Sequence, residues 1–232
     1  MKRKVGWMTL LLLMAATVFY IGRDAVIFTA GGTVRGQQAE LCVVIDAGHG
    51  GEDPGKVGIN GAKEKDINLE IAEKVKQYLE NNGVRVEMTR ESDAGLHEAG
   101  ASNKKVQDMK KRIEKIEKIQ PDIVVSIHQN SYPQEAVHGA QVFYYTGSGE
   151  GQELAEEIQG QLVAKVDPDN KRQIKANDSY YLLKKTKVPI VIVECGFLSN
   201  SAEAGKLCDP EYQDRVAWAV HLGIIRCLNG KS

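Results

Sequence analysis

The sequence predicts a single three-layer α/β/α domain, in which a mainly parallel, twisted sheet lies between two layers of helices. Two observations support this fold class. Apolar runs at 41–45, 123–127 and 188–193 show almost no polar alternation, which is typical of strands buried on both faces. Segments between these runs carry apolar residues at helical spacing. Strands that alternate with helices form right-handed βαβ units with parallel strands.

The elements follow each other along the chain at lengths that suit this fold. The first strand, 41–46, leads into a glycine-rich loop that extends to about Lys65. A helix follows, with Asp66 as its expected N-cap and Gly83 just past its end. The further expected elements are a strand at 84–89, a basic helix at 104–120, strands at 123–127 and 140–145, a helix at 151–166, a short apolar element at 180–183, a strand at 188–193 and a helix at 211–228.

Size and charge narrow the possible functions. The chain has 232 residues, 42% of them hydrophobic, which is enough for one well-formed core. The formal net charge is −1. A strongly basic nucleic-acid binder is therefore disfavoured, and we expect no nucleic-acid partner.

The N-terminus predicts export. Lys2, Arg3 and Lys4 precede an uncharged, largely apolar run at 5–21, which is typical of a signal anchor or a signal peptide. We favour an uncleaved membrane anchor over a cleaved signal, and either over a buried core helix. The basic end should stay inside, so the rest of the chain should cross the membrane. The expected organisation is an anchor or signal at 1–23, a linker at 24–39 and a catalytic domain at 40–230.

Four cysteines in an exported chain raise the question of disulfides. Cys42 and Cys195 lie in or beside predicted strands, and Cys208 and Cys227 lie near the last helix. There is no CxxC spacing, and a domain of roughly 190 residues can be stable without disulfides. We therefore expect free, mostly buried thiols.

Three buried strands each end in a polar residue that a core strand does not need. His49 comes just after the first, and His128 and Glu194 come at the ends of two others. Each alone is more simply interpreted as a structural residue. The carboxyl ends of parallel strands share one edge, however, and ligands bind at that edge in open α/β sheets. An ionised glutamate there is costly unless a cation or strong donors meet it.

Two imidazoles and a carboxylate at one edge fit a zinc site, and catalytic zinc sites keep one position open for water. The residues alone do not say which carboxylate binds the metal and which acts as general base. Glu64 and Glu194 are the leading candidates, followed by Asp46, Glu52 and Asp53. Glu64 falls in the loop before the predicted helix, where its carboxylate should be free to move. Glu194 falls on a rigid strand.

Five stretches resemble the zinc-dependent N-acetylmuramoyl-L-alanine amidases of the Amidase_3 type, in that family's order and spacing. They are DAGHGGEDPG (46–55), EKDINLEIA (64–72), MTRESD (88–93), SIHQN (126–130) and VECGFLSN (193–200). The resemblance covers about residues 40–228. It implies that His49, Glu64 and His128 bind one zinc ion. It also implies that Glu194 is the catalytic acid and base for amide hydrolysis, and that the fold is a three-layer α/β domain.

Within the family the chain is most similar to the germination-specific amidases of the spore cortex (CwlD type). GAQVFYY (139–145) and EYQDRVAWAV (211–220) carry this closer likeness, together with the short N-terminal segment. The likeness implies removal of peptide stems from muramic acid as the first step toward muramic-δ-lactam. It also implies a place between the forespore membranes, with a possible accessory sporulation protein as partner. The stretch 94–107 departs from the family because it lacks arginines.

Substrate contacts and alternative activities complete the expectations. Asn130 and His138 lie close enough to His128 in sequence to be candidate substrate-binding residues, whereas Arg90 is more simply explained as structural. The alternatives are a zinc peptidase or deacetylase acting on cell-wall material, and a non-catalytic wall-binding protein. The presence of all four candidate zinc and catalytic residues disfavours the last of these.

Overall fold

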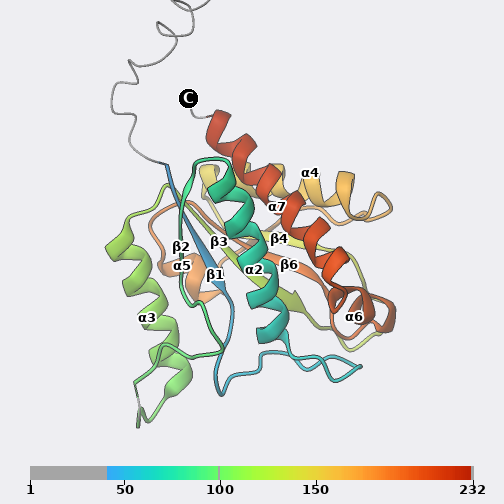
Figure 1. Ribbon diagram of the computed structural model, residues 1–232, viewed down its shortest axis with the longest axis horizontal. Helices are drawn as coiled ribbons and strands as arrows, with labels where there is room; N and C mark the ends of the chain where they lie inside the picture. The colour runs from blue at the N-terminus through green and yellow to red at the C-terminus, as the bar shows by residue number, and fades with distance from the viewer. Residues whose placement is uncertain (1–40, 99, 231–232) are drawn as a thin grey trace, which may run out of the picture. The chain divides into compact units, whose positions relative to one another are not determined.

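A computed structural model describes residues 41–98 and 100–230, and these contain one six-stranded sheet of order β2-β1-β3-β6-β4-β5 (Figure 1). The strands are β1 (Cys42–Ala47), β2 (Arg85–Met88), β3 (Ile123–Asn130), β4 (Gln141–Tyr145), β5 (Lys175–Asn177) and β6 (Ile190–Phe197). The β4–β6 pair is antiparallel, and the other pairs are parallel. This confirms the prediction of a mainly parallel sheet.

Helices cover both faces of the sheet, as predicted. The helices are α2 (Glu64–Asn81), α3 (Lys104–Ile119), α4 (Gly149–Lys165), α5 (Tyr181–Lys185), α6 (Ser201–Leu207) and α7 (Pro210–Gly230). Val43 and Ile45 of β1 pack into the core shared with α2, α4 and α7, whereas Val44 packs into a smaller cluster with α3 and α5. Successive side chains of a strand point to opposite faces, so an uninterrupted apolar run serves both layers.

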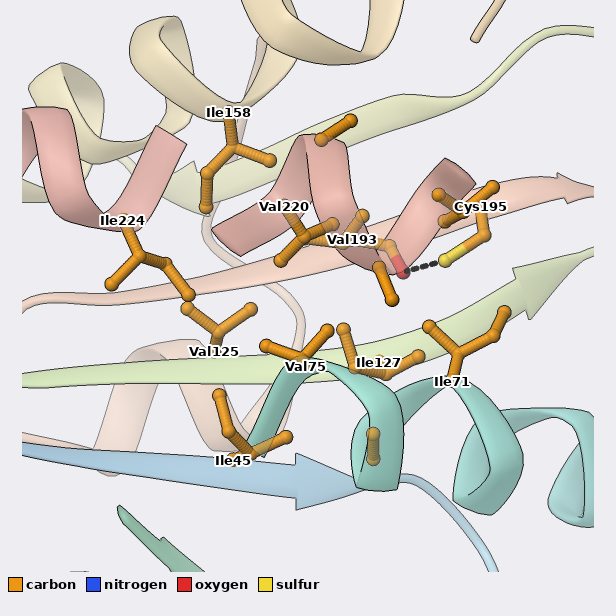
Figure 2. Close-up of a cluster of buried hydrophobic side chains, with 14 of the residues drawn as sticks. Ile45, Ile71, Val75, Val125, Ile127, Ile158, Val193, Cys195, Val220 and Ile224 are labelled. Carbon is orange, nitrogen blue, oxygen red and sulfur yellow. Dashed lines mark hydrogen bonds between the residues drawn. The ribbon is translucent and has the colours of Figure 1, made fainter. Parts of the chain in front are cut away.

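The larger core lies between the central strands and three helices (Figure 2). Ile45, Val125 and Val193 of the sheet face Val75 of α2 and Val220 of α7, and all five are fully buried. The apolar stripe on α4 that residues 154, 158 and 162 form is also buried in this core. That stripe therefore packs against the fold and leaves the opposite face of α4 to solvent.

Several boundaries differ from the prediction. Helix α2 begins at Glu64, so Asp66 lies in its first turn and is not the N-cap. The reason is that Glu64 N–H donates to the Lys56 carbonyl and Lys65 N–H to the Pro54 carbonyl, so the loop itself satisfies the first free amides. Strands β3 and β6 run on past His128 and Glu194. Strand β5 and helix α6 were not predicted, because both are short.

Three of the four cysteines are buried, in line with the prediction of mostly buried side chains. Cys42, Cys195 and Cys227 are buried, and Cys208 is exposed. The predicted anchor at 1–23 and linker at 24–39 lie outside the described residues. Among the residues that are described, no helix has both the length and the apolar character needed to cross a membrane.

Candidate active site

The parallel strands bring the predicted site residues to one edge of the sheet. His49 follows β1 directly, and His128 of β3 lies opposite Glu194 of β6 in the strand register. All three line a cavity of about 260 Å³, together with Glu64 from the first turn of α2. The inference that separate strands deliver these residues to a shared edge is confirmed.

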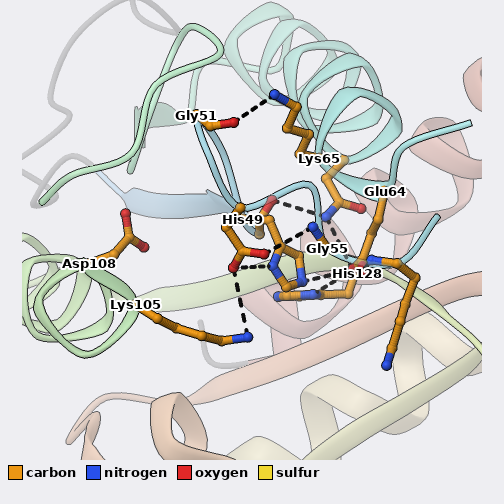
Figure 3. A network of polar contacts seen from close by, with 12 residues as sticks. His49, Gly51, Gly55, Glu64, Lys65, Lys105, Asp108 and His128 are labelled. Carbon is orange, nitrogen blue, oxygen red and sulfur yellow. Dashed lines mark hydrogen bonds and ion pairs between the residues drawn. The ribbon is translucent and has the colours of Figure 1, made fainter. Parts of the chain in front are cut away.

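His49, Glu64 and His128 form a compact cluster of possible metal donors. One ligand atom from each lies within 4.8 Å of the others. Glu64 Oε1 lies 2.9 Å from His128 Nδ1 and 3.2 Å from His49 Nε2, so it sits between the two rings (Figure 3). Two imidazole nitrogens and a carboxylate oxygen are donors that zinc accepts in catalytic sites.

Glu64 is held rigidly, and the prediction that it lies in a flexible loop was wrong. Its side chain is 2% exposed. Oε2 accepts a 2.7 Å hydrogen bond from Lys56 N–H, and Oε1 accepts one of 3.1 Å from Gln129 N–H. Burial acts to raise the pKa of Glu64, but the hydrogen bonds with His128 and His49 outweigh it and leave that pKa well below its usual value. The carboxylate is thus ionised at neutral pH.

His49 is oriented by a second carboxylate. Its Nδ1 lies 2.9 Å from Asp53 Oδ2, which leaves Nε2 to face Glu64. An outer carboxylate of this kind fixes the tautomer and orientation of a metal-binding histidine. His49 itself adopts a left-handed backbone with φ of 62°. The Nη2 of Arg112 donates a 2.6 Å hydrogen bond to the His49 carbonyl and helps to hold this conformation.

Two glycines are required for the rings and carboxylate to come so close. A Cβ at Gly48 would lie 2.3 Å from the His128 ring, and one at Gly55 would lie 2.5 Å from Glu64 Oε2. Gly55 also has a φ of 68°, which L side chains rarely adopt. The glycine-rich sequence between β1 and α2 therefore allows the loop to pack directly against the cluster.

Glu194 lies on the cavity wall with an unsatisfied carboxylate. The residue is 8% exposed, and within residues 41–98 and 100–230 its Oε2 has no hydrogen-bond partner. Burial raises the pKa of Glu194 to about 7; attraction to His128 opposes this shift and repulsion from Glu64 adds to it. A carboxyl group with this pKa can take up or release a proton near neutral pH.

The other candidate carboxylates have structural partners. Asp46 is buried beneath the site, where Arg112, Ser126 and Thr89 satisfy it. Glu52 pairs with Lys104 on the surface. Arg112 was not predicted from the sequence, although a lone arginine on the apolar side of a basic helix could have indicated a buried ion pair.

The remaining candidates divide between two hollows. Asn130 lines the same cavity as the cluster, whereas His138 lines a separate hollow beside Asn170 and Arg172. Arg90 is structural, as expected, because its guanidinium donates to the backbone carbonyls of residues 47, 48, 65 and 92. Lys56 also lines the cavity and was not predicted from the sequence.

Comparisons with known proteins agree with this geometry. The profile of the Amidase_3 family, described as N-acetylmuramoyl-L-alanine amidase, matches residues 43–226. The germination-specific N-acetylmuramoyl-L-alanine amidase of Bacillus subtilis (strain 168) is 38% identical over 192 residues, which cover 82% of this chain and 80% of that protein.

Solved structures give the same result. The CwlD amidase from Clostridioides difficile, solved in complex with the GerS lipoprotein, matches with a TM-score of 0.80 and 39% identity, over 82% of this chain and 99% of that one. The amidase AmiC2 of Nostoc punctiforme matches with a TM-score of 0.72 and 33% identity, over 82% and 98%. The family match over residues 43–226 and the 38% identity to the Bacillus subtilis relative show that the chain belongs to the Amidase_3 family of N-acetylmuramoyl-L-alanine amidases.

Proposed function

We propose that the protein is a zinc-dependent hydrolase of the amide bond between N-acetylmuramic acid and L-alanine in peptidoglycan. His49, Glu64 and His128 hold the metal, and Glu194 is the catalytic acid and base. One observation carries this proposal: Glu194, whose buried Oε2 has no hydrogen-bond partner among the described residues, lines the same cavity as a cluster of three zinc-type donors. An unsatisfied buried carboxylate is costly, and a proton-donating reactant in the cavity would satisfy it.

The donor set fits zinc better than a hard cation. Calcium and magnesium prefer six or more oxygen ligands, whereas this cluster offers two imidazoles and one carboxylate. Three protein ligands also leave room for water or substrate. When bound, zinc polarises a carbonyl oxygen and makes water more acidic.

Glu194 carries out two proton transfers in the proposed reaction. Glu194 first takes a proton from the attacking water as its oxygen bonds to the lactyl carbonyl carbon. It then gives a proton to the L-alanine nitrogen as the carbon–nitrogen bond breaks. The products are a lactyl carboxylic acid, which loses its remaining proton to solvent at neutral pH, and a peptide with a free amine. A pKa of about 7 suits a group that must accept and then donate a proton.

Substrate contacts extend from this centre. Asn130 lines the cavity, and we propose that its side-chain amide contacts the substrate near the scissile bond. His138 lies in the separate hollow, so it would contact a substrate that extends as far as that surface.

The biological setting follows from the relatives and the N-terminal sequence. The Bacillus subtilis relative is named for germination, and the Clostridioides difficile structure pairs a related amidase with a lipoprotein. We propose that this protein acts on spore-cortex peptidoglycan, as the first step toward muramic-δ-lactam. It would be held by residues 1–23 with its catalytic domain outside the cytoplasm, in the forespore intermembrane space. An accessory sporulation protein is a possible partner.

Digestion of purified cortex peptidoglycan tests the reaction. The protein is incubated with and without a chelator, zinc is then restored, and the products are analysed by mass spectrometry. The expected products are muramic acid with a free lactyl carboxylate and peptides that begin with L-alanine, lost on chelation and restored by zinc. Cleavage within the peptide, or release of acetate, would instead identify a peptidase or a deacetylase.

A further inference from the structure

The cavity has three cationic side chains on its walls, and they differ in what they contact. Arg112 is committed to the fold, because it forms 2.6 Å ion pairs with Asp46 and with Asp108. Lys105 lies 3.8 Å from Asp53, the carboxylate that orients His49. Lys56 also lines the cavity, yet within the described residues its ammonium has no hydrogen bond or ion pair.

The backbone of Lys56 is fixed to the donor cluster. Its N–H donates to Glu64 Oε2 at 2.7 Å, and its carbonyl accepts from Glu64 N–H at 2.9 Å. The preceding Gly55 packs directly against Glu64 and His49. The backbone that carries the ammonium is therefore fixed to the cluster, while the side chain is exposed and lines the cavity. Both contacts use the backbone, so a change of the Lys56 side chain leaves them in place.

The charge of Lys56 reaches the catalytic carboxylate. Burial is the largest influence on Glu194 and raises its pKa, and the charge of Lys56 acts in the opposite direction. A cation on the wall of this cavity, with no hydrogen bond or ion pair among the described residues, is placed to meet an anion on the substrate. Charge-assisted hydrogen bonds of this kind are among the stronger polar contacts.

The chemistry of the proposed substrate indicates which anion this is. Around the scissile amide the sugar half is neutral, whereas the peptide half carries free carboxylates. We propose that Lys56 is a specificity-determining residue that binds a free carboxylate on the peptide side. The protein then prefers stems whose second residue keeps its α-carboxylate over stems in which that group is amidated. This inference rests on the proposed function and adds the orientation of the substrate, with the peptide directed toward the loop that carries Lys56.

Two matched substrates test the inference. They are muramoyl peptides that differ in one group, with the α-carboxyl of the second residue free in one and amidated in the other. Steady-state kinetics are measured for the wild-type protein and for Lys56→Met, Lys56→Arg, Lys105→Met and Lys63→Met. Lys63 is the matched control, because it lies at the other end of the same loop, is exposed and does not line the cavity.

The wild-type protein should have a kcat/KM about 10-fold higher for the acidic substrate, mainly through KM, which is the size expected for one partly exposed charge-assisted contact. Lys56→Met should remove this preference and keep bound zinc, Lys56→Arg should restore it, and Lys63→Met should leave it unchanged. The inference is overturned if the wild type treats both substrates alike, if Lys56→Met weakens both equally, or if Lys105→Met is the variant that removes the preference. Absence of peptide release from either substrate by the zinc-loaded wild type would contradict the proposed function itself.

Discussion

Two buried carboxylates lie at the same edge of the sheet and differ in how fully their oxygens are hydrogen-bonded. Asp46, at the end of β1, accepts hydrogen bonds from Arg112, Thr89 and Ser126 at 2.5–2.7 Å. Glu194, on β6, has an oxygen with no hydrogen-bond partner in the part of the chain that the structure describes. Both residues are more than nine-tenths buried. Burial alone therefore does not distinguish these two carboxylates, whereas the number of hydrogen-bonded oxygens does.

The protonation of the two groups follows from these surroundings. Burial acts to raise the pKa of Asp46, but Arg112 and the two hydroxyls outweigh it and lower that pKa to about 2. For Glu194, burial prevails and raises the pKa to about 7. Asp46 is thus a fixed negative charge that holds α3 beneath the site. Glu194 can change its protonation during a reaction.

The largest expected effect comes from removing a metal donor next to Glu194. His128→Ala should lose bound zinc and nearly all hydrolysis, because it removes one of the three proposed ligands. Elemental analysis and turnover measure both effects. His97→Ala is the control, because His97 lies outside the cavity. Retention of zinc by His128→Ala would show that the cluster is not the metal site.

Substitutions around Asp46, whose oxygens are hydrogen-bonded, should instead change the stability of the fold. Arg112→Met should lower the free energy of unfolding by about 3–5 kcal/mol, because it leaves Asp46 as a buried charge without its partner. Urea denaturation measures this change. Lys111→Met on the same helix is the control and should cost at most about 0.5 kcal/mol, since its ion pairs are exposed. An Arg112 variant as stable as the wild type would remove the structural role from this group.

The two regions should also respond oppositely to pH in the metal-free protein. The folded-state pKa of Glu194, about 7, lies above the 4.5 of an unperturbed glutamate, so the folded state binds the proton more tightly. Stability from this group is full below about pH 4.5 and is lost as pH rises to about 7, by up to about 3 kcal/mol. Asp46 has a lowered pKa, so its contribution is full above about pH 4 and is lost as pH falls toward 2.

Denaturation of the chelated wild type and of Glu194→Gln, at several pH values, separates the Glu194 contribution. The stability difference between the two proteins should change between pH 5 and pH 8 in favour of the variant. A difference that stays constant over this range would mean that Glu194 is not a perturbed carboxyl.

A smaller effect is expected from the carboxylate behind His49. Asp53→Asn should weaken zinc binding by a factor of about 10–100, because it removes the charge that orients His49 while leaving the ligands intact. Competition with a zinc chelator measures the affinity. Glu52→Gln is the matched control, since Glu52 pairs with Lys104 on the surface. Equal affinity in both variants would exclude this role for Asp53.

The sequence was most informative where burial dictated the pattern. The uninterrupted apolar runs predicted the central strands, and the polar residues after them predicted a shared edge at which His49, His128 and Glu194 meet. The side-chain contacts could not be predicted from the sequence. Glu64 lies in a polar stretch that is typical of a loop, but it is the first residue of α2, and hydrogen bonds from the Lys56 and Gln129 amides make it rigid.

Long-range pairing explains the other differences as well. Arg112 lies 66 positions from Asp46 in the chain, so local periodicity could not reveal that they form an ion pair. His138 is ten positions from His128, yet β4 and the loops around it place it in another hollow. Nearness along the chain was therefore a poor guide to the cavity wall.

The most direct test of the account compares Glu64→Gln with Glu194→Gln, measuring zinc per chain and turnover for each. Both changes keep the size of the side chain and remove its charge. The account predicts that Glu194→Gln binds zinc like the wild type and hydrolyses substrate slower by a factor of about 10²–10⁴, as expected for loss of a positioned acid and base. Glu64→Gln should lose zinc together with activity. If Glu194→Gln lost the metal while Glu64→Gln kept it and stayed inactive, the roles of the two glutamates would be reversed.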